Sequence, residues 1–267
     1  MKTFRKIIAI SLSVIIMLAA ASARYEKTDK KKEDKESTTV TQTTTKAYPP
    51  EKTSPNIRYF VHKSAKADKS YFDDVVFIGD SVSKKLDYYD MENDCLGNAI
   101  FLTSISLGVA NCLWGLYNSN EVHPMYNGTK MRAPDAVIAS GRSKVYIMLG
   151  MNDLNTYGVD GTLEKLKELI SEIKTGNPAA EIFMQSVTPI YGNKIEVTNE
   201  LVNSYNTALS ELCRQNKWNY LDVASVLRDD TTGGLPLKYC GDPEAMGIHF
   251  NSDACQVWVN YLYTHTA

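Results

Sequence analysis

The chain has 267 residues, of which 43% are hydrophobic, and a formal net charge of −2 at pH 7. Basic residues do not outnumber acidic ones, so the charge balance argues against a nucleic-acid-binding protein. The five cysteines are too few and too irregularly spaced for a disulfide scaffold, and no C-x-x-C pair indicates a metal site.

Residues 1–23 have the pattern of a secretory signal peptide. Three basic residues precede an apolar run that begins at Ile7, and the small residues before position 24 form an Ala-x-Ala site that ends at Ala23. A membrane anchor is the alternative, but the apolar run is short for a helix that crosses a bilayer. We therefore expect cleavage after Ala23 and a secreted protein with no stable membrane insertion.

Residues 24–58 contain charges of both signs, then a threonine-rich tract, then prolines, with almost no aliphatic side chains to bury. This composition predicts a disordered spacer. Contact with anionic wall polymers is the alternative for its lysine-rich part, but the interleaved acidic residues favour a solvated tether. Residues 59–267 have the length and apolar content of one domain with a single core.

Apolar runs alternate with helical patterns along this domain. Five runs are predicted as strands, at residues 75–78, 99–105, 145–149, 182–187 and 220–226. Continuous hydrophobicity in them indicates strands that are buried on both faces. Apolar residues with helical spacing predict helices, at residues 162–174, 196–216 and 252–264. The alternation predicts an α/β fold with a parallel sheet between two layers of helices.

The first candidate site residue, Ser81, follows the first strand in the stretch FIGDSVS. Parallel sheets bind ligands beyond the carboxyl ends of their strands. A serine on a tight strand-to-helix turn projects its hydroxyl out of the sheet, beside a helix N-terminus that favours negative charge. The alternative is a helix N-cap with an Asx turn, and the Gly-Asp-Ser triplet alone does not decide between them.

Two further candidates follow the second and third strands. Gly108, in ISLGVAN, either allows a backbone turn or lets a backbone N–H approach a substrate closely. Asn152, in LGMNDLN, is either a turn residue or helix cap, or it donates a side-chain N–H to an oxyanion. Neither residue is decisive alone.

The last candidate is His249, in MGIHFN just before the last predicted helix. The other histidines are His62 at the end of the spacer, His123 in a polar loop and His265 near the C-terminus. His249 alone is predicted to lie in a loop that returns to the strand ends. It is therefore the candidate general base.

Together these four stretches resemble the SGNH hydrolases, also called GDSL esterases and lipases, whose sequence blocks centre on Ser, Gly, Asn and His in that order. The matching residues are Ser81, Gly108, Asn152 and His249, and the resemblance spans about residues 74–262. It implies a flavodoxin-like three-layer α/β/α sandwich with a central parallel sheet of about five strands. It also implies hydrolysis of carboxylic esters.

The resemblance further implies a mechanism through an acyl-enzyme. His249 would take the proton of Ser81, and Ser81 would attack the ester carbonyl. The tetrahedral oxyanion would be held by the Ser81 N–H, the Gly108 N–H and the Asn152 side chain. Water would then hydrolyse the acyl-enzyme, and this chemistry requires no metal or organic cofactor.

One position departs from the family's pattern. The family usually carries an aspartate three residues before the histidine, and Met246 stands there. Three hypotheses follow: a substitute carboxylate from Asp242 or Glu244, a Ser–His dyad in which a backbone carbonyl or water orients His249, or an impaired enzyme. We expect Asp242 to be the substitute, because the restricted φ of the following Pro243 would fix the loop and hold the carboxylate near the ring.

Two features of the sequence bear on the substrate. Residues 112–132 are rich in aromatic and polar side chains, and they either stack on a sugar or form an ordinary covering segment with Trp114 and Tyr117 in the core. Export on a spacer favours small acyl groups, such as acetyl, on extracellular carbohydrate. The sequence contains no long apolar lid segment of the kind that would indicate a lipid substrate. The alternatives are a catalytically impaired carbohydrate- or cell-wall-binding module and a lipase or lysophospholipase-type esterase.

Two expectations concern covalent and quaternary structure. Cys240 and Cys255 bracket His249, and a disulfide between them would fix its loop, although the three other cysteines compete for pairing. We also expect a monomer whose partner is a small-molecule or polysaccharide ester.

Overall fold

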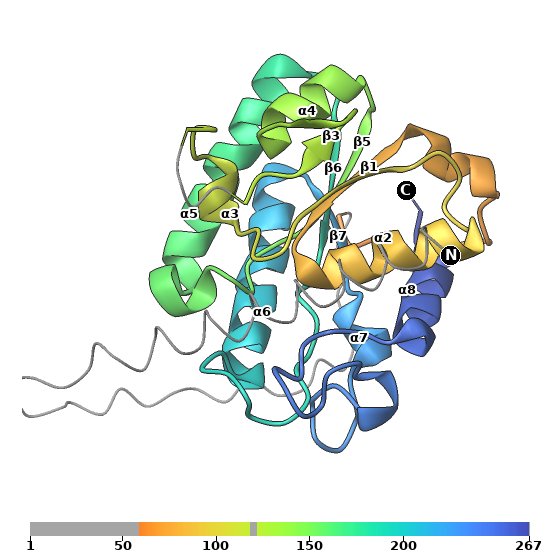
Figure 1. Cartoon of the computed structure of the whole chain (residues 1–267), viewed down its shortest axis with the longest axis vertical. Coiled ribbons are helices and arrows are strands. Elements are labelled where there is room, and N and C mark those ends of the chain that lie inside the picture. Colours follow the sequence, from red (N-terminus) through yellow and green to blue (C-terminus); the bar gives the residue numbers. More distant parts are fainter. Residues whose placement is uncertain (1–58, 118–121, 267) are drawn as a thin grey trace, which may run out of the picture. The chain divides into compact units, whose positions relative to one another are not determined.

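The computed structural model describes residues 59–117 and 122–266 (Figure 1). The signal peptide predicted for residues 1–23 and the spacer predicted for residues 24–58 lie outside the described residues. Among the residues described, no helix is both long and apolar enough to cross a membrane.

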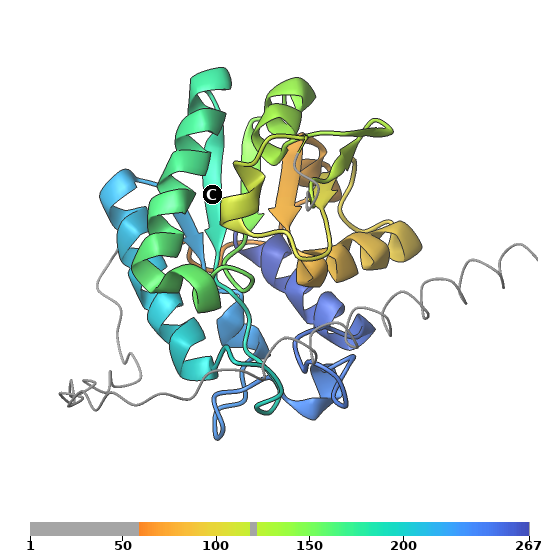
Figure 2. The same cartoon turned by 60° about the vertical axis from the view of Figure 1, so that its left-hand side comes forward.

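The described chain folds into one five-stranded parallel sheet with helices on both faces, plus a small hairpin (Figures 1 and 2). The strands are β1 (Val75–Gly79), β2 (Ile100–Thr103), β3 (Met125–Tyr126), β4 (Thr129–Lys130), β5 (Lys144–Met148), β6 (Glu181–Gln185) and β7 (Asn219–Leu221). The α-helices are α2 (Ser81–Asn93), α3 (Val109–Cys112), α4 (Ala133–Ser140), α5 (Leu154–Gly176), α6 (Asn199–Asn216), α7 (Ala224–Leu227) and α8 (Ser252–Thr264). Two 3-10 helices are η1 (Lys69–Asp74) and η2 (Leu237–Tyr239).

The sheet has the strand order β2-β1-β5-β6-β7, and all neighbouring strands are parallel. The chain therefore runs from β1 outward to β2 and then returns to the other side of β1 to form β5. Ligand sites of such sheets lie where the strand order reverses, which here is beyond the carboxyl ends of β1 and β5. The predicted α/β fold with a parallel sheet of about five strands is confirmed.

Alternate residues of the strands face two separate cores, as expected for a sheet that is covered on both sides. Val76 and Ile78 of β1 pack with apolar residues of α4, α5 and α6. Val75 and Phe77, which point the other way, pack with residues of α2, α7 and α8. Figure 2 shows the green and cyan helices α5 and α6 on one side of the sheet and the blue α8 on the other.

Some predicted elements have different bounds. The run 220–226 is predicted as one strand, but β7 ends at Leu221 and the second half of the run forms α7. The chain turns there because the N–H of Ala224 donates to Ser186 Oγ beyond the end of β6, at 2.8 Å. The helix predicted at 162–174 is part of the longer α5, which Gly158 interrupts with a positive φ of 63°.

The cysteines do not form the disulfide expected between Cys240 and Cys255, because all five are free thiols. Cys240 instead directs its sulfur at the Asp242 carboxylate, 3.6 Å from Oδ1. Cys255 is buried in α8. The loop of His249 is thus shaped by hydrogen bonds rather than by a covalent bridge.

Candidate active site

Ser81 is the first residue of α2, directly after the tight turn that leaves β1. The preceding Asp80 is the helix N-cap, and its Oδ1 accepts a hydrogen bond from the Val82 N–H at 2.8 Å. This cap fixes the start of the helix, so the serine hydroxyl projects from the carboxyl end of the sheet. The Gly-Asp-Ser triplet therefore combines the two alternatives, with the cap on Asp80 and the exposed hydroxyl on the next residue.

His249 is carried to Ser81 by a short antiparallel arch before α8. Cys240 and Phe250 form an isolated antiparallel bridge, and the Gly241 N–H donates to the His249 carbonyl at 2.7 Å. Between the two arms, the carbonyl of Asp242 accepts from the N–H groups of the turn residues Ala245 and Gly247. The arch thus brings residues 242 and 249 together at its base.

The side chains of Ser81, His249 and Asp242 form a continuous hydrogen-bonded chain. His249 Nε2 lies 2.9 Å from Ser81 Oγ, and His249 Nδ1 lies 2.7 Å from Asp242 Oδ2. The other carboxylate oxygen, Oδ1, accepts from the His249 backbone N–H at 3.0 Å. Asp242 therefore fixes both the ring and the backbone of the histidine, with the geometry of a nucleophile, a base and an orienting carboxylate.

The other candidates for the third position do not contact the ring. The family's usual aspartate position is occupied by Met246, which is 43% exposed. Glu244 is also exposed, and no hydrogen bond or ion pair is formed by it within the described part of the chain. Of the carboxylates in this loop, Asp242 alone contacts the imidazole, although it lies seven residues before the histidine instead of three.

Gly108 and Asn152 lie on the other side of Ser81, at the ends of β2 and β5. Asn152 Nδ2 donates to the Leu107 carbonyl at 3.0 Å and lies 3.4 Å from Asp80 Oδ2. The Gly108 N–H donates to Asn111 Oδ1 at 2.7 Å. The structure therefore brings these two residues to neighbouring positions, but both donors are engaged by acceptors of the protein itself.

Sequence reasoning missed two residues that build this side of the site, Asn111 and Asp153. Asp153 accepts from the N–H groups of Val109 and Ala110, at 2.8 and 2.9 Å, and so anchors the start of α3 to the loop after β5. A Cβ at Gly108 would lie 2.7 Å from the Asp153 carboxylate, so glycine is required by this close approach. The signal in the sequence was the Asn-Asp pair after β5 and the asparagine three residues after Gly108.

Two buried carboxyl groups have raised pKa values because burial disfavours the charged form. Desolvation raises the pKa of Asp80 to about 6, against opposing hydrogen bonds from the N–H groups of Val82 and Ser83 and attraction by His249. Desolvation also raises the pKa of Asp153, against the hydrogen bonds from Ala110 and Val109. Asp80 is only 3% exposed and lies between the two sides of the site.

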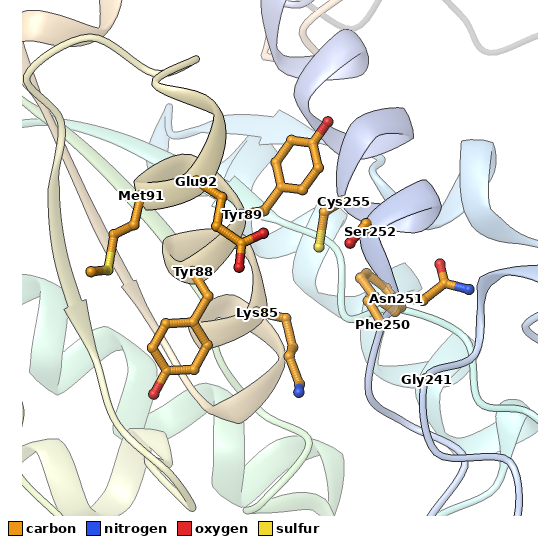
Figure 3. Close-up of a pocket in the computed structure, with 10 residues that line it drawn as sticks. All are labelled: Lys85, Tyr88, Tyr89, Met91, Glu92, Gly241, Phe250, Asn251, Ser252 and Cys255. Carbon is orange, nitrogen blue, oxygen red and sulfur yellow. The ribbon is translucent and has the colours of Figure 1, made fainter. Parts of the chain in front are cut away.

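A groove of about 480 Å³ lies between α2 and the segment that leads into α8 (Figure 3). One wall is formed by α2, including Lys85, Tyr88 and Glu92, and the other includes Asn251 and Ser252. Lys85 lies four residues after Ser81, and Tyr88 and Glu92 follow at further intervals of three and four residues. Residues at these spacings share one face of a helix, so all three lie on the same face of α2 as the serine. The groove therefore begins about one helical turn from Ser81.

Two aromatic side chains of residues 112–117 are not part of the core. Tyr117 is fully exposed and Trp114 is only partly buried, so the alternative that placed both in the core is wrong. His123, predicted to lie in a polar loop, is buried. Among the described residues no group of three or more His, Cys, Asp or Glu side chains is placed to hold a metal ion.

A sequence model of the GDSL-like lipase/acylhydrolase family matches residues 117–257, just over half of the chain. The matched region contains Asn152, Asp242 and His249, and it begins after Ser81 and Gly108.

Solved structures resemble the fold at low sequence identity. A GDSL-like lipase from Bacteroides thetaiotaomicron has a TM-score of 0.55 at 16% identity, with 70% of this chain and 84% of that chain covered. A Bacteroides fragilis protein described as an acylhydrolase has a TM-score of 0.55 at 18% identity, covering 70% and 83%. At these identities the likeness shows a shared fold.

One curated relative carries a different name. N-acylneuraminate cytidylyltransferase of Escherichia coli is 30% identical over 209 residues, which represent 76% of this chain and 43% of that protein. The chain therefore spans less than half of the length of this relative.

Proposed function

We propose that this chain, which belongs to the GDSL-like lipase/acylhydrolase family, is a serine ester hydrolase. In this proposal Ser81 is the nucleophile, His249 is the general base and Asp242 is the carboxylate that orients the base. The observation that carries this proposal is the continuous chain of hydrogen bonds from Ser81 Oγ through both ring nitrogens of His249 to Asp242. No rearrangement is needed to connect the three groups.

In the proposed reaction, His249 Nε2 removes the proton from Ser81 Oγ while the oxygen attacks the ester carbonyl carbon. Asp242 keeps the proton on Nδ1 and stabilises the imidazolium that forms. The tetrahedral intermediate then collapses, and the imidazolium gives its proton to the departing alcohol. Water attacks the acyl-serine with the same base, which releases the carboxylic acid and restores the serine hydroxyl.

We assign the oxyanion donors to the Ser81 N–H, the Gly108 N–H and the Asn152 side chain. The Ser81 N–H is at the first position of α2, where backbone N–H groups have no intrahelical acceptor, and no acceptor for it exists among the residues described. An oxyanion bound to this N–H would lie at the N-terminal end of the 13-residue helix α2, whose dipole stabilises negative charge.

For the substrate, we propose a small acyl group, such as acetyl, on a carbohydrate. The groove beside Ser81 combines aromatic and polar side chains, which suits a sugar better than an alkyl chain. Lys85 in this groove forms no ion pair with any described residue, which favours a sugar with an acidic group. The name of the E. coli relative also points to an acylated sugar, N-acylneuraminate.

We propose that the enzyme acts outside the cell, with residues 1–23 as a signal peptide and residues 24–58 as a tether. The basis is the sequence pattern alone. Mass spectrometry of the protein recovered from the culture medium and from the cells tests it. A new N-terminus at Arg24 in the medium supports export, whereas a protein found only in the cytoplasm with residues 1–23 retained contradicts it.

The function is tested by hydrolysis of p-nitrophenyl esters from acetyl to long acyl chains, with Ser81→Ala as the control. We expect Ser81-dependent turnover that is fastest for acetyl. Preference for long acyl chains would support a lipase-type esterase instead. Absence of Ser81-dependent turnover for any ester would support a carbohydrate- or wall-binding module.

The alcohol half is tested with O-acetylated acidic and neutral sugars as substrates. We expect the acidic sugar to be preferred by the wild type and the preference to shrink in Lys85→Ala. Lys84→Ala is the matched control, because Lys84 is on the same helix but is paired with Asp87 at 3.2 Å. Equal rates on both sugars in all variants would contradict the proposal that the sugar carries an acidic group.

A further inference from the structure

The peptide group between Leu107 and Gly108 has both of its polar atoms engaged. Its carbonyl oxygen accepts from Asn152 Nδ2 at 3.0 Å, and its N–H donates to Asn111 Oδ1 at 2.7 Å. No cis peptide bond occurs in the described chain. In a planar trans peptide group, the C=O and the N–H point in opposite directions.

This geometry separates the two oxyanion donors. Asn152 lies on the carbonyl side of the peptide group, so the Gly108 N–H points away from Asn152. An oxyanion within hydrogen-bond distance of Asn152 Nδ2 therefore cannot also accept from the Gly108 N–H in the observed orientation. The donors converge only if the peptide group turns over.

We propose that the oxyanion site is completed by rotation of the Leu107–Gly108 peptide group, and that Asn111 is the positioning residue that stabilises both orientations. The inference rests on the proposed roles of Ser81, Gly108 and Asn152. Rotation directs the Gly108 N–H towards the oxyanion and the Leu107 carbonyl towards Asn111. It also releases Asn152 Nδ2 from the carbonyl, so that it can donate to the oxyanion.

An asparagine side chain suits this role because its amide has both an acceptor and two donors. In the observed orientation, Asn111 Oδ1 accepts from Gly108, and its Nδ2 donates to the Ser106 carbonyl at 3.0 Å. After rotation, a half-turn of the Asn111 amide lets Nδ2 donate to the Leu107 carbonyl in place of the Ser106 carbonyl, and water can reach that carbonyl because Ser106 is exposed. The peptide group thus has a hydrogen-bond partner on this side in either state.

The residues around the peptide group allow it to turn without moving its neighbours. Gly108 has φ −122° and ψ 170°, and turning the preceding peptide group takes its φ to positive values, a region that glycine tolerates and other residues rarely adopt. Asp153 holds the next two N–H groups of α3, and the Leu107 side chain is fully buried. The change is therefore confined to one peptide group.

The test compares Asn111→Asp with Asn111→Ala, using kcat and KM for p-nitrophenyl acetate and the melting temperature of each variant. A carboxylate accepts from the Gly108 N–H but cannot donate to the rotated carbonyl, so Asn111→Asp holds the observed orientation. We expect its kcat to fall about 10²-fold, the scale of losing one oxyanion donor, with little change in KM. Asn111→Ala supports neither orientation, so its kcat falls less than that of Asn111→Asp.

A purely structural role for Asn111 gives the opposite order. Aspartate in the first turn of a helix is favourable, so Asn111→Asp would then keep wild-type stability and activity, and Asn111→Ala would lose both. Asn93→Asp, on the exposed end of α2, adds the same charge and serves as the matched control.

The outcomes separate this inference from the proposed function. Ser81-dependent turnover in the wild type, together with wild-type kcat in a folded Asn111→Asp, overturns the inference and leaves the proposed function standing. Absence of Ser81-dependent turnover in the wild type overturns both.

Discussion

The two sides of the candidate site differ in how far they are prepared for reaction. On the side of the arch, Ser81, His249 and Asp242 already form the hydrogen bonds that proton transfer requires. On the side of β2 and β5, Gly108 and Asn152 donate to internal acceptors instead of to a common point. In the proposed mechanism, the base is therefore in place before a substrate binds, whereas the oxyanion site is completed when the substrate binds.

The difference follows from how each side is built. The arch is closed by backbone hydrogen bonds between its two arms and by the two contacts of one carboxylate with His249. The opposite side depends on a four-residue helix, α3, whose N–H groups each need a partner when no ligand is bound. Asparagine and aspartate side chains supply those partners.

The largest expected effect comes from the arch side, with Ser81→Ala. Loss of the nucleophile should lower kcat for p-nitrophenyl acetate by on the order of 10⁴ or more, with the melting temperature unchanged, because the hydroxyl contributes little packing. A fluorophosphonate probe should label the wild type and not the variant. Equal labelling of both would show that another residue is the nucleophile.

The next effect separates Asp242 from its neighbours in the loop. Asp242→Asn should lower kcat by about 10⁴, because the amide supports the wrong ring tautomer and does not stabilise the imidazolium. Glu244→Gln should leave kcat unchanged, since this exposed side chain does not contact His249. If neither change lowers kcat, a backbone carbonyl or water orients the ring.

Met246→Asp restores the family's usual pattern and also tests whether Asp242 orients His249. It should not raise kcat, because His249 Nδ1 is already hydrogen-bonded to Asp242. A gain in kcat with a simpler pH profile would show that Asp242 supports the histidine poorly.

Much of this architecture was accessible from sequence, for reasons that particular residues illustrate. The strand β1 was predicted, at residues 75–78, because burial on both faces gives a continuous apolar run, and His249 stood out by its position before a clear helix. By contrast, the orientation of one peptide group at Gly108 leaves no pattern in the sequence. The contact of Asp242 with His249 was one of several hypotheses, because loop conformation decides it.

On the oxyanion side, Asn152→Ala should lower kcat by on the order of 10²–10³, with a smaller change in KM. The donor acts mainly as negative charge develops, so ground-state binding is little affected. Steady-state kinetics on acetyl esters measure this. Near-wild-type kcat would mean that Asn152 serves only to hold the Leu107 carbonyl.

An effect on stability rather than on rate is expected for Asp80, which lies between the two sides. Burial raises its pKa from 3.8 to about 6, so the folded state binds this proton more tightly than the unfolded state. The stability that this group confers is therefore full below pH 4 and is lost as the pH rises to about 6. Relative to Asp80→Asn, which keeps the N-cap, the wild type should lose about 3 kcal/mol of unfolding free energy between pH 3.5 and 7.

Urea unfolding of wild type and Asp80→Asn at several pH values measures this difference directly. A difference in unfolding free energy that does not change with pH would show that the carboxyl titrates normally.

The contrast between the two sides is tested most directly by a crystal structure of the protein with a phosphonate bound covalently to Ser81, whose P–O oxygen takes the place of the oxyanion. We predict that His249 and Asp242 keep their observed hydrogen bond, while the Leu107–Gly108 peptide group is turned over, with its N–H on the phosphonyl oxygen and its carbonyl on Asn111. A phosphonyl oxygen held by Ser81 N–H and Asn152 while the Gly108 N–H still donates to Asn111 would contradict the account.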